Sequence, residues 1–165
     1  MKRTWHKQLP QTQKWHRRYL RLAREISSWS KDPSTKVGAV LVDNRRRGIG
    51  FGYNGFPKGV PDTQMDYEDR ELKYKLVVHA EENAILNCPI PIHHCEATLF
   101  VWPLFPCNEC AKVIIQAGVK QVVSTDTQIG RWSEANDLAA NMLDHAGIDY
   151  IIYPAKEIDK DATGK

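Results

Sequence analysis

Long apolar runs, repeats and linker-like tracts are all missing from this 165-residue sequence. No apolar stretch approaches the roughly 20 residues that cross a bilayer, so we expect no membrane partner. Residues 1–13 contain lysine and arginine but lack the apolar segment of a secretory signal, which predicts a cytoplasmic protein. With this length and no linker, we expect one domain over residues 1–155 and a polar tail at 156–165.

Cysteine is also scarce, with four in the chain: Cys88, Cys95, Cys107 and Cys110. Two disulfides are conceivable, but nothing marks the chain for export to an oxidising compartment. Cys107 and Cys110 are instead separated by two residues, which is a spacing typical of metal ligands. Zinc is therefore the favoured interpretation for this pair.

The net charge of +3 is small for a protein that binds nucleic acid, and we expect no such partner. Much of the positive charge nevertheless lies early in the chain, at Lys14, Arg17, Arg18, Arg21, Arg24 and residues 45–47. Two interpretations stay open: a solvated helix face with a basic hairpin tip, or a surface that attracts a phosphorylated ligand.

The apolar pattern predicts alternating helices and strands. A first amphipathic helix should end near Ser30, because Asp32-Pro33 disfavours helical geometry. Its apolar positions recur every three or four residues: Trp15, Tyr19, Leu22, Ile26 and Trp29. A hairpin over 37–42 and 49–53 follows, then helices at 76–86, 107–117 and 133–146 and strands at 98–101, 119–124 and 149–153. This order predicts an α/β fold, a three-layer α/β/α sandwich with a mixed five-stranded sheet.

Two short motifs carry the chemistry: His79-Ala80-Glu81 and Pro106-Cys107-Asn108-Glu109-Cys110. Two cysteines three positions apart at a helix start lie on one face, and the free N–H groups of that turn favour thiolates. With His79, they give three zinc ligands and leave the fourth tetrahedral position for water, which is a catalytic arrangement. The alternative is a closed structural site with Cys88, Cys95, His93 or His94 as fourth ligand.

Glu81 follows His79 by two positions, so on a helix their side chains diverge by about 200° and cannot both bind one ion easily. We expect Glu81 to move protons instead, accepting one from the zinc-bound water and donating it to the substrate. The alternative role for Glu81 is that of an acidic residue that stabilises the helix N-terminus.

A His-x-Glu motif followed by Pro-Cys-x-x-Cys is the signature of zinc-dependent nucleobase deaminases. Together with further segments, the chain resembles the deoxycytidylate (dCMP) deaminase family, of cytidine deaminase-like fold, over roughly residues 15–153. The matching segments, in the family's order, are Ser30 to Pro33, Val37 to Ala39, Gly52 to Gly59, His79 to Ala84 and 104–118. The resemblance implies hydrolysis of dCMP to dUMP and ammonia, which feeds thymidylate synthesis, one catalytic Zn²⁺ per chain, and a homo-oligomer, often a hexamer.

The resemblance also implies substrate contacts. Asn54 would bind a sugar hydroxyl, the Ala80 backbone would contact the base, and Phe105 would line the base pocket. Ser30 and Lys31 are the candidates for the phosphate, ahead of Arg131 and Tyr153. Three of these residues have a purely structural alternative: Asn54 as a turn asparagine, Phe105 as a core aromatic and Lys31 as a solvated lysine.

The sequence departs from the family's pattern at three places. Residues 101–106 form a longer and bulkier connection, Val60-Pro61 stands where relatives often have a cysteine, and 127–132 matches poorly. Regulation by dCTP or dTTP is therefore left open. The competing functions are deamination of dCTP, deoxycytidine, or a base in tRNA or single-stranded DNA, and a non-enzymatic zinc-binding module.

Overall fold

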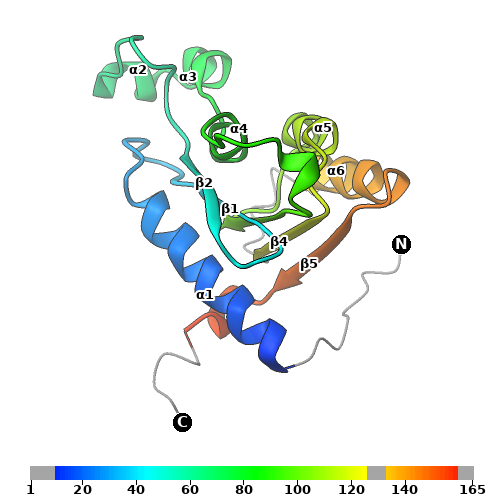
Figure 1. Ribbon diagram of the computed structural model, residues 1–165. Helices are drawn as coiled ribbons and strands as arrows, with labels where there is room; N and C mark the ends of the chain where they lie inside the picture. The colour runs from blue at the N-terminus through cyan, green and yellow to red at the C-terminus, as the bar shows by residue number, and fades with distance from the viewer. Residues whose placement is uncertain (1–9, 126–132, 160–165) are drawn as a thin grey trace.

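Five strands form one mixed sheet in the order β2-β1-β3-β4-β5 (Figure 1). The computed structural model describes residues 10–125 and 133–159. The strands are β1 (Gly38–Val42), β2 (Gly48–Tyr53), β3 (Thr98–Trp102), β4 (Gln121–Thr125) and β5 (Asp149–Tyr153). β1 runs antiparallel to β2 and β3, whereas β3, β4 and β5 are parallel. The expected hairpin and mixed sheet are confirmed.

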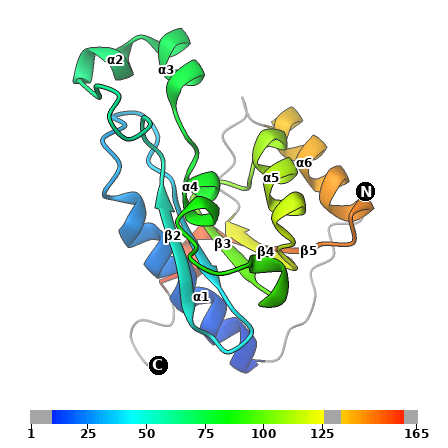
Figure 2. The same cartoon turned by 45° about the horizontal axis from the view of Figure 1, so that its top comes forward.

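Helices cover both faces of this sheet, because successive side chains of a strand point to opposite faces. Those of the two layers are α1 (Pro10–Ser27), α4 (Ala80–Leu86), α5 (Asn108–Ala117) and α6 (Ser133–His145). α1 packs on the face that carries Val40 and Phe100, whereas α4, α5 and α6 pack on the face that carries Leu41 and Leu99. Figures 1 and 2 show the resulting layers, which confirm the predicted α/β/α sandwich.

The buried stripe of α1 differs from the one expected. Leu20, Ala23 and Ile26 are the fully buried apolar residues of this helix. Leu22 is 38% exposed, and Trp29 lies beyond the end of the helix with 57% exposure, so the prediction was wrong for both. Spacing of three or four residues finds an apolar face, but the sheet decides which of the overlapping stripes is covered.

The segment between β2 and α4 also differs. Helices α2 (Gln64–Glu68) and α3 (Arg70–Leu76) were not predicted, and they extend beyond the sheet (Figure 2). The expected helix over 76–86 is correct only from Ala80, because α3 ends at Leu76 and Val78 then forms two backbone hydrogen bonds with Gly55, of 3.1 and 2.8 Å. His79 thereby becomes the residue that starts α4.

The chain after β5 packs back onto α1. A short 3-10 helix, η3 (Ala155–Glu157), is followed by Ile158, which is fully buried in the core beneath α1. The Ile158 carbonyl accepts a hydrogen bond from Arg21 at 3.0 Å, and Asp159 pairs with Arg24 at 2.8 Å. The expected boundary between residues 155 and 156 therefore lies within a packed segment.

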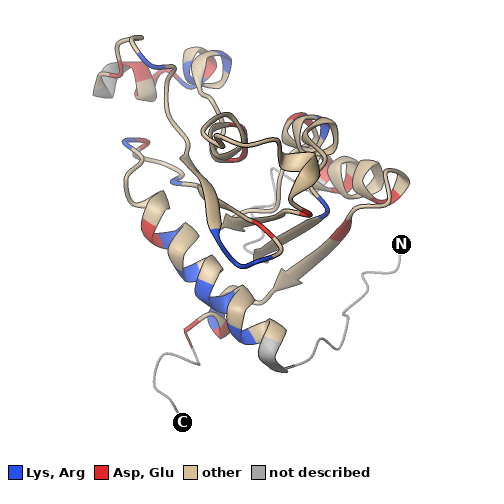
Figure 3. Cartoon of the chain, viewed as in Figure 1, with Lys and Arg blue, Asp and Glu red and all other residues tan. Residues whose placement is uncertain are grey.

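Basic residues gather along α1 and at the turn between β1 and β2 (Figure 3). They lie on the sheet face opposite to α4 and α5, or at the hairpin tip. Three are paired with acidic side chains: Arg17 with Glu157, Arg24 with Asp159 and Arg47 with Asp43. This placement favours the solvated helix face over the attraction of a ligand. Among the described helices, none is both long and apolar enough to span a bilayer.

Candidate active site and metal centre

The two motifs meet where helices α4 and α5 begin. His79 is the residue before the first turn of α4, and Cys107 holds the same position in α5, each with extended backbone angles. Glu82 fixes the start of α4 by accepting a hydrogen bond from the His79 backbone N–H at 3.2 Å. Cys110 lies one turn into α5 and is buried. Two helix N-termini thus direct their first side chains to one point.

The three side chains form a compact set of nitrogen and sulfur atoms. His79 Nδ1 lies 3.2 Å from Cys110 Sγ and 3.5 Å from Cys107 Sγ, and all three ligand atoms lie within 4.8 Å of one another. A tetrahedral zinc ion, with Zn–N of about 2.0 Å and Zn–S of about 2.3 Å, requires such atoms roughly 3.5 to 3.8 Å apart. The donor set and its spacing therefore fit Zn²⁺.

Within the described part of the chain, no fourth histidine, cysteine or carboxylate joins this set. The thiol of Cys88 donates to the Ile90 carbonyl and that of Cys95 to the Pro91 carbonyl, each at 3.3 Å. The arrangement favours three protein ligands with an open fourth position, as in catalytic zinc sites, over a closed structural site.

The electrostatics of the set suit a metal ion. The hydrogen bond from the Cys110 thiol and then that from His79 hold the pKa of Cys107 at about 4, against the opposing effect of burial. The same contact with Cys107 raises the pKa of His79 to about 9. One sulfur is therefore already a thiolate at neutral pH, which is the form that binds zinc.

Glu81 lies in the first turn of α4 and is only 4% exposed. It lines the same cleft as His79 and Cys107, but its carboxylate is not among the grouped ligand atoms, as its offset from His79 predicts. Burial raises the pKa of Glu81, while the neighbouring His79 opposes this shift. A raised pKa lets a carboxyl group hold a proton more readily, as a group that accepts and passes on a proton in catalysis must.

A cleft opens beside these groups. Its lining residues are Asp32, Thr35, Val37, Asn54, Lys73, Tyr74, Val77, His79, Ala80, Glu81, Leu104, Phe105, Cys107 and Asn136. Three of the expected substrate residues, Asn54, Ala80 and Phe105, lie in this lining. Phe105 is 7% exposed and meets the Tyr150 ring edge-on, with ring centroids 5.3 Å apart. The connection at 101–106 also reaches the cleft, through Leu104 and Phe105.

The candidate phosphate residues lie elsewhere. Ser30 is buried, and its hydroxyl donates to the backbone carbonyl of Asn54 at 2.8 Å. The exposed ammonium of Lys31 pairs with Asp62 at 2.7 Å. Tyr153 hydrogen-bonds to His16 at 3.0 Å beneath α1, on the opposite face of the sheet, and Arg131 lies outside the described residues. The phosphate contacts of Ser30 and Lys31 stay a prediction.

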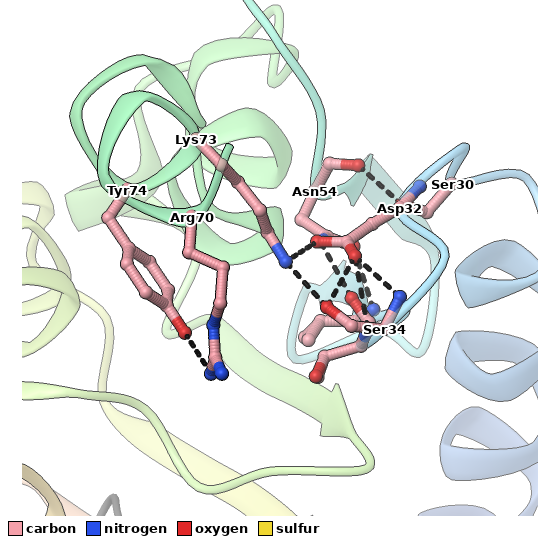
Figure 4. Close-up of polar contacts among 9 residues, drawn as sticks. Ser30, Asp32, Ser34, Asn54, Arg70, Lys73 and Tyr74 are labelled. Atoms are coloured by element: carbon pink, nitrogen blue, oxygen red, sulfur yellow. Dashed lines mark hydrogen bonds and ion pairs between the residues drawn. The ribbon is translucent and has the colours of Figure 1, made fainter. Parts of the chain in front are cut away.

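Lys73 is a charged residue of the cleft that was not among the expected site residues. It comes from α3, is 5% exposed, and its ammonium lies 2.7 Å from Asp32 Oδ2 (Figure 4). A lysine in a short polar helix looks solvated in a sequence, because its carboxylate partner is distant in the chain. The one feature of the sequence that bears on Lys73 is its partner Asp32, which lies in the Ser30 to Pro33 segment that matches the family.

A histidine, two cysteines and a buried glutamate, placed at helix N-termini on a three-layer α/β/α sheet, define the class of zinc-dependent nucleobase deaminases. Residues 13–125 match the family described as the cytidine and deoxycytidylate deaminase zinc-binding region. The chain belongs to this family.

Individual relatives agree with this membership. A probable deoxycytidylate deaminase of Caenorhabditis elegans is 46% identical over 138 residues, which cover 82% of this chain and 68% of that protein. The deoxycytidylate deaminase of Pongo abelii is 38% identical over 143 residues, covering 82% of this chain and 78% of the relative. The crystal structure of dCMP deaminase from cyanophage S-TIM5, in complex with dCMP and dUMP, has the same fold. Its TM-score is 0.65 at 24% identity, covering 88% of this chain and 99% of that one.

Proposed function

We propose that this chain deaminates dCMP to dUMP and ammonia with one zinc ion held by His79, Cys107 and Cys110. The observation that carries the proposal is the convergence of these three ligands beside buried Glu81, in a cleft lined by Asn54. The deoxycytidylate deaminases among its relatives support dCMP as the substrate.

When bound, zinc lowers the pKa of a water ligand toward neutrality and so supplies the nucleophile. Glu81 is the group that can hold the proton released by that water, because burial raises the pKa of its carboxyl. It then passes this proton to the ring nitrogen next to the attacked carbon, which makes that carbon more electrophilic. Glu81 then transfers the remaining proton of the added hydroxyl group to the exocyclic amine. The C–N bond breaks, the amine leaves as ammonia, and the hydroxyl becomes the carbonyl of the uracil ring.

The remaining contacts orient the nucleotide. We assign the backbone of Ala80, next to Glu81, to a contact with the base and the Phe105 ring to an apolar wall of the base pocket, because both residues line the cleft. Asn54 is buried at the side of the cleft and is assigned to a sugar hydroxyl. Ser30 and Lys31 remain the proposed phosphate contacts.

The proposal includes a cytoplasmic homo-oligomer with one site per chain. Large apolar side chains are exposed near the edge strand β2, including Trp29 and Phe51 at 57% and 43%, and such a patch supports burial between subunits. Light scattering of the purified protein tests this: a monomer at micromolar concentration would contradict it. Adding dCTP or dTTP to the activity assay tests regulation.

Replacement of Glu81 by Gln tests the chemistry. We expect Glu81→Gln to keep one zinc per chain and to lose at least 10²- to 10⁴-fold in kcat, since only proton transfer is removed. Cys107→Ala should instead lose the zinc itself, as measured by elemental analysis. A near-normal rate in Glu81→Gln, or full zinc retention in Cys107→Ala, would contradict the assignment.

The substrate is decided by ammonia release from dCMP, dCTP, deoxycytidine, a cytosine-containing single strand and tRNA, at equal concentration and moderate salt. We expect the highest kcat/KM for dCMP. A preference for dCTP or deoxycytidine would preserve the zinc chemistry and refute the monophosphate. A preference for either polynucleotide would refute a small-nucleotide enzyme, and a zinc-loaded protein that releases no ammonia would indicate a binding module.

A further inference from the structure

A buried ion pair lies on the wall of the cleft, away from the zinc ligands. Lys73 and Asp32 are 5% and 1% exposed, and their charged atoms are 2.7 Å apart. Taking two charges out of water is costly, and such pairs often stabilise a protein less than apolar side chains would. The position of this pair, in contact with Asn54, suggests a role other than stability.

The Asp32 carboxylate is the centre of a network that leaves neither oxygen free (Figure 4). Oδ1 accepts hydrogen bonds from the backbone N–H and the hydroxyl of Ser34, at 2.8 and 2.9 Å, and from the Thr35 N–H at 3.1 Å. Oδ2 accepts from Lys73 and, at 3.3 Å, from the side-chain amide of Asn54. Lys73 also donates to the Ser34 hydroxyl at 2.7 Å. The carboxylate is therefore held from both sides.

This network determines how the Asn54 amide is oriented. Its Nδ2 group donates one hydrogen to Asp32 and the other to the Thr35 carbonyl at 2.9 Å. Its Oδ1 accepts from the Val37 N–H at 2.8 Å. An amide rotated by 180° would place N–H against N–H and oxygen against carboxylate, so the network permits one orientation. Among the described residues, this leaves one lone pair on Oδ1 for a ligand.

We infer that Lys73 and Asp32 are positioning residues. Their ion pair locks the Asn54 amide so that only its oxygen can bind a ligand. The cleft therefore selects a sugar hydroxyl, which can donate a hydrogen bond to that oxygen. This inference rests on the proposed function, because it takes dCMP as the ligand. In dCMP the 3′-hydroxyl is the only free hydroxyl of the sugar. A group that can only accept, such as fluorine at the same position, finds no partner at Asn54.

The alternative is that Lys73 binds the substrate phosphate directly. Its ammonium already has Asp32 and Ser34 as partners at 2.7 Å, and the adjacent carboxylate cancels its charge. The geometry therefore favours a positioning role. The two roles affect different ends of the nucleotide and can be measured separately.

The test compares three substrates of the zinc-loaded full chain: dCMP, its 3′-fluoro-3′-deoxy analogue, and deoxycytidine. For the wild type we expect dCMP to exceed the fluoro analogue by on the order of tenfold in kcat/KM, the effect of one hydrogen bond to a buried acceptor. In Lys73→Met the amide is released, so this ratio should fall to about twofold or less, through a higher KM for dCMP. Lys73→Arg, which keeps the charge and donors, should restore much of the ratio.

Two variants control the comparison. Lys75→Met removes an exposed lysine of the same helix and should retain the wild-type ratio. The Asp32→Asn/Lys73→Met double variant removes both charges, which avoids leaving a lone buried carboxylate if Lys73→Met alone does not fold. It should show the same loss of discrimination, with normal zinc content.

Each result decides the inference. A wild-type ratio near one, or a ratio that stays near tenfold in the folded Lys73 variants, overturns it. The inference is also overturned if the Lys73 variants lose only the advantage of dCMP over deoxycytidine in kcat/KM, because that result would assign Lys73 to the phosphate. If the wild type does not deaminate dCMP at all, the proposed function fails and the hydroxyl assignment fails with it. If dCMP is deaminated but the fluoro ratio does not depend on Lys73, only the positioning role is refuted.

Discussion

Gly52 of β2 sets how closely helix α4 approaches the sheet, and with it the position of His79 and Glu81. A Cβ atom at Gly52 would lie 2.3 Å from the Ala80 carbonyl oxygen and 2.3 Å from the Ala84 nitrogen. Both are backbone atoms of α4, so no side-chain rotation can relieve the contact. We therefore expect Gly52→Ala to displace the helix that carries the candidate catalytic residues.

The size of the displacement follows from the distances. Ordinary contacts of a Cβ begin at 3.4 Å, so α4 must move by roughly 1 Å, a misplacement that can cost about 10²-fold in rate. The overpacking itself should destabilise the fold by about 1 to 3 kcal/mol. Because Ala80 lies between His79 and Glu81, the same movement affects the metal ligand and the proton carrier.

The assay is kcat/KM for dCMP at saturating zinc, with urea unfolding measured on the same preparations. Gly48→Ala is the matched control on the same strand, since its Cβ would meet only the side-chain ring of Phe51, at 2.9 Å, and this exposed ring has room to rotate away. We expect near-normal activity for Gly48→Ala and a loss of about 10²-fold for Gly52→Ala at a temperature where both are folded. Equal activity in the two variants would show that α4 does not depend on this close approach.

Two further predictions concern stability. Burial lowers the pKa of His16 from 6.5 to about 4. Between these pH values the unfolded chain binds a proton that the folded chain does not, so the free energy of unfolding falls as the pH is lowered. The loss should reach about 3 kcal/mol below pH 4. Urea unfolding at pH 7 and pH 5 should show a smaller pH dependence in His16→Gln, and an unchanged dependence would refute this. Asp43→Ala removes the acceptor for the Arg45 and Arg47 N–H groups, at 3.0 and 2.8 Å. It should lower the free energy of unfolding by about 1 to 3 kcal/mol without changing zinc content, and a loss of zinc would show that the hairpin turn influences the site.

The sheet and the metal centre could be predicted because their signals are local. Strands β1 and β2 are short apolar or glycine-rich runs around a turn, and α5 has an apolar face that ends at Gly118, which adopts the left-handed conformation at φ 79°. The ligands Cys107 and Cys110 lie on one helix turn, so their proximity follows from helix geometry alone. His79 joins them only through tertiary packing, and there the prediction depended on a known motif.

The α3 contribution could not be read from the sequence. A seven-residue helix in which four residues are charged has too little apolar periodicity to be recognised, and its start depends on Asp69 capping the Leu72 N–H at 3.0 Å. The contact of Lys73 with Ser34 joins residues 39 positions apart. No spacing rule links such positions, so the sequence alone did not show that Ser30 and Asp32 both hydrogen-bond Asn54.

Helix α4 connects the chemistry to the edge of the sheet. β2 is an edge strand, and an exposed edge can pair with other chains. Asn83 and Asn87, one helical turn apart, donate hydrogen bonds to the β2 carbonyls of Tyr53 and Phe51, at 2.8 and 2.9 Å. Together with the close approach at Gly52, these bonds hold α4 against β2 along its length. Because the same helix begins with His79 and Glu81, the contacts that cover the edge also fix the metal ligand and the proton carrier relative to Asn54, the residue that follows β2.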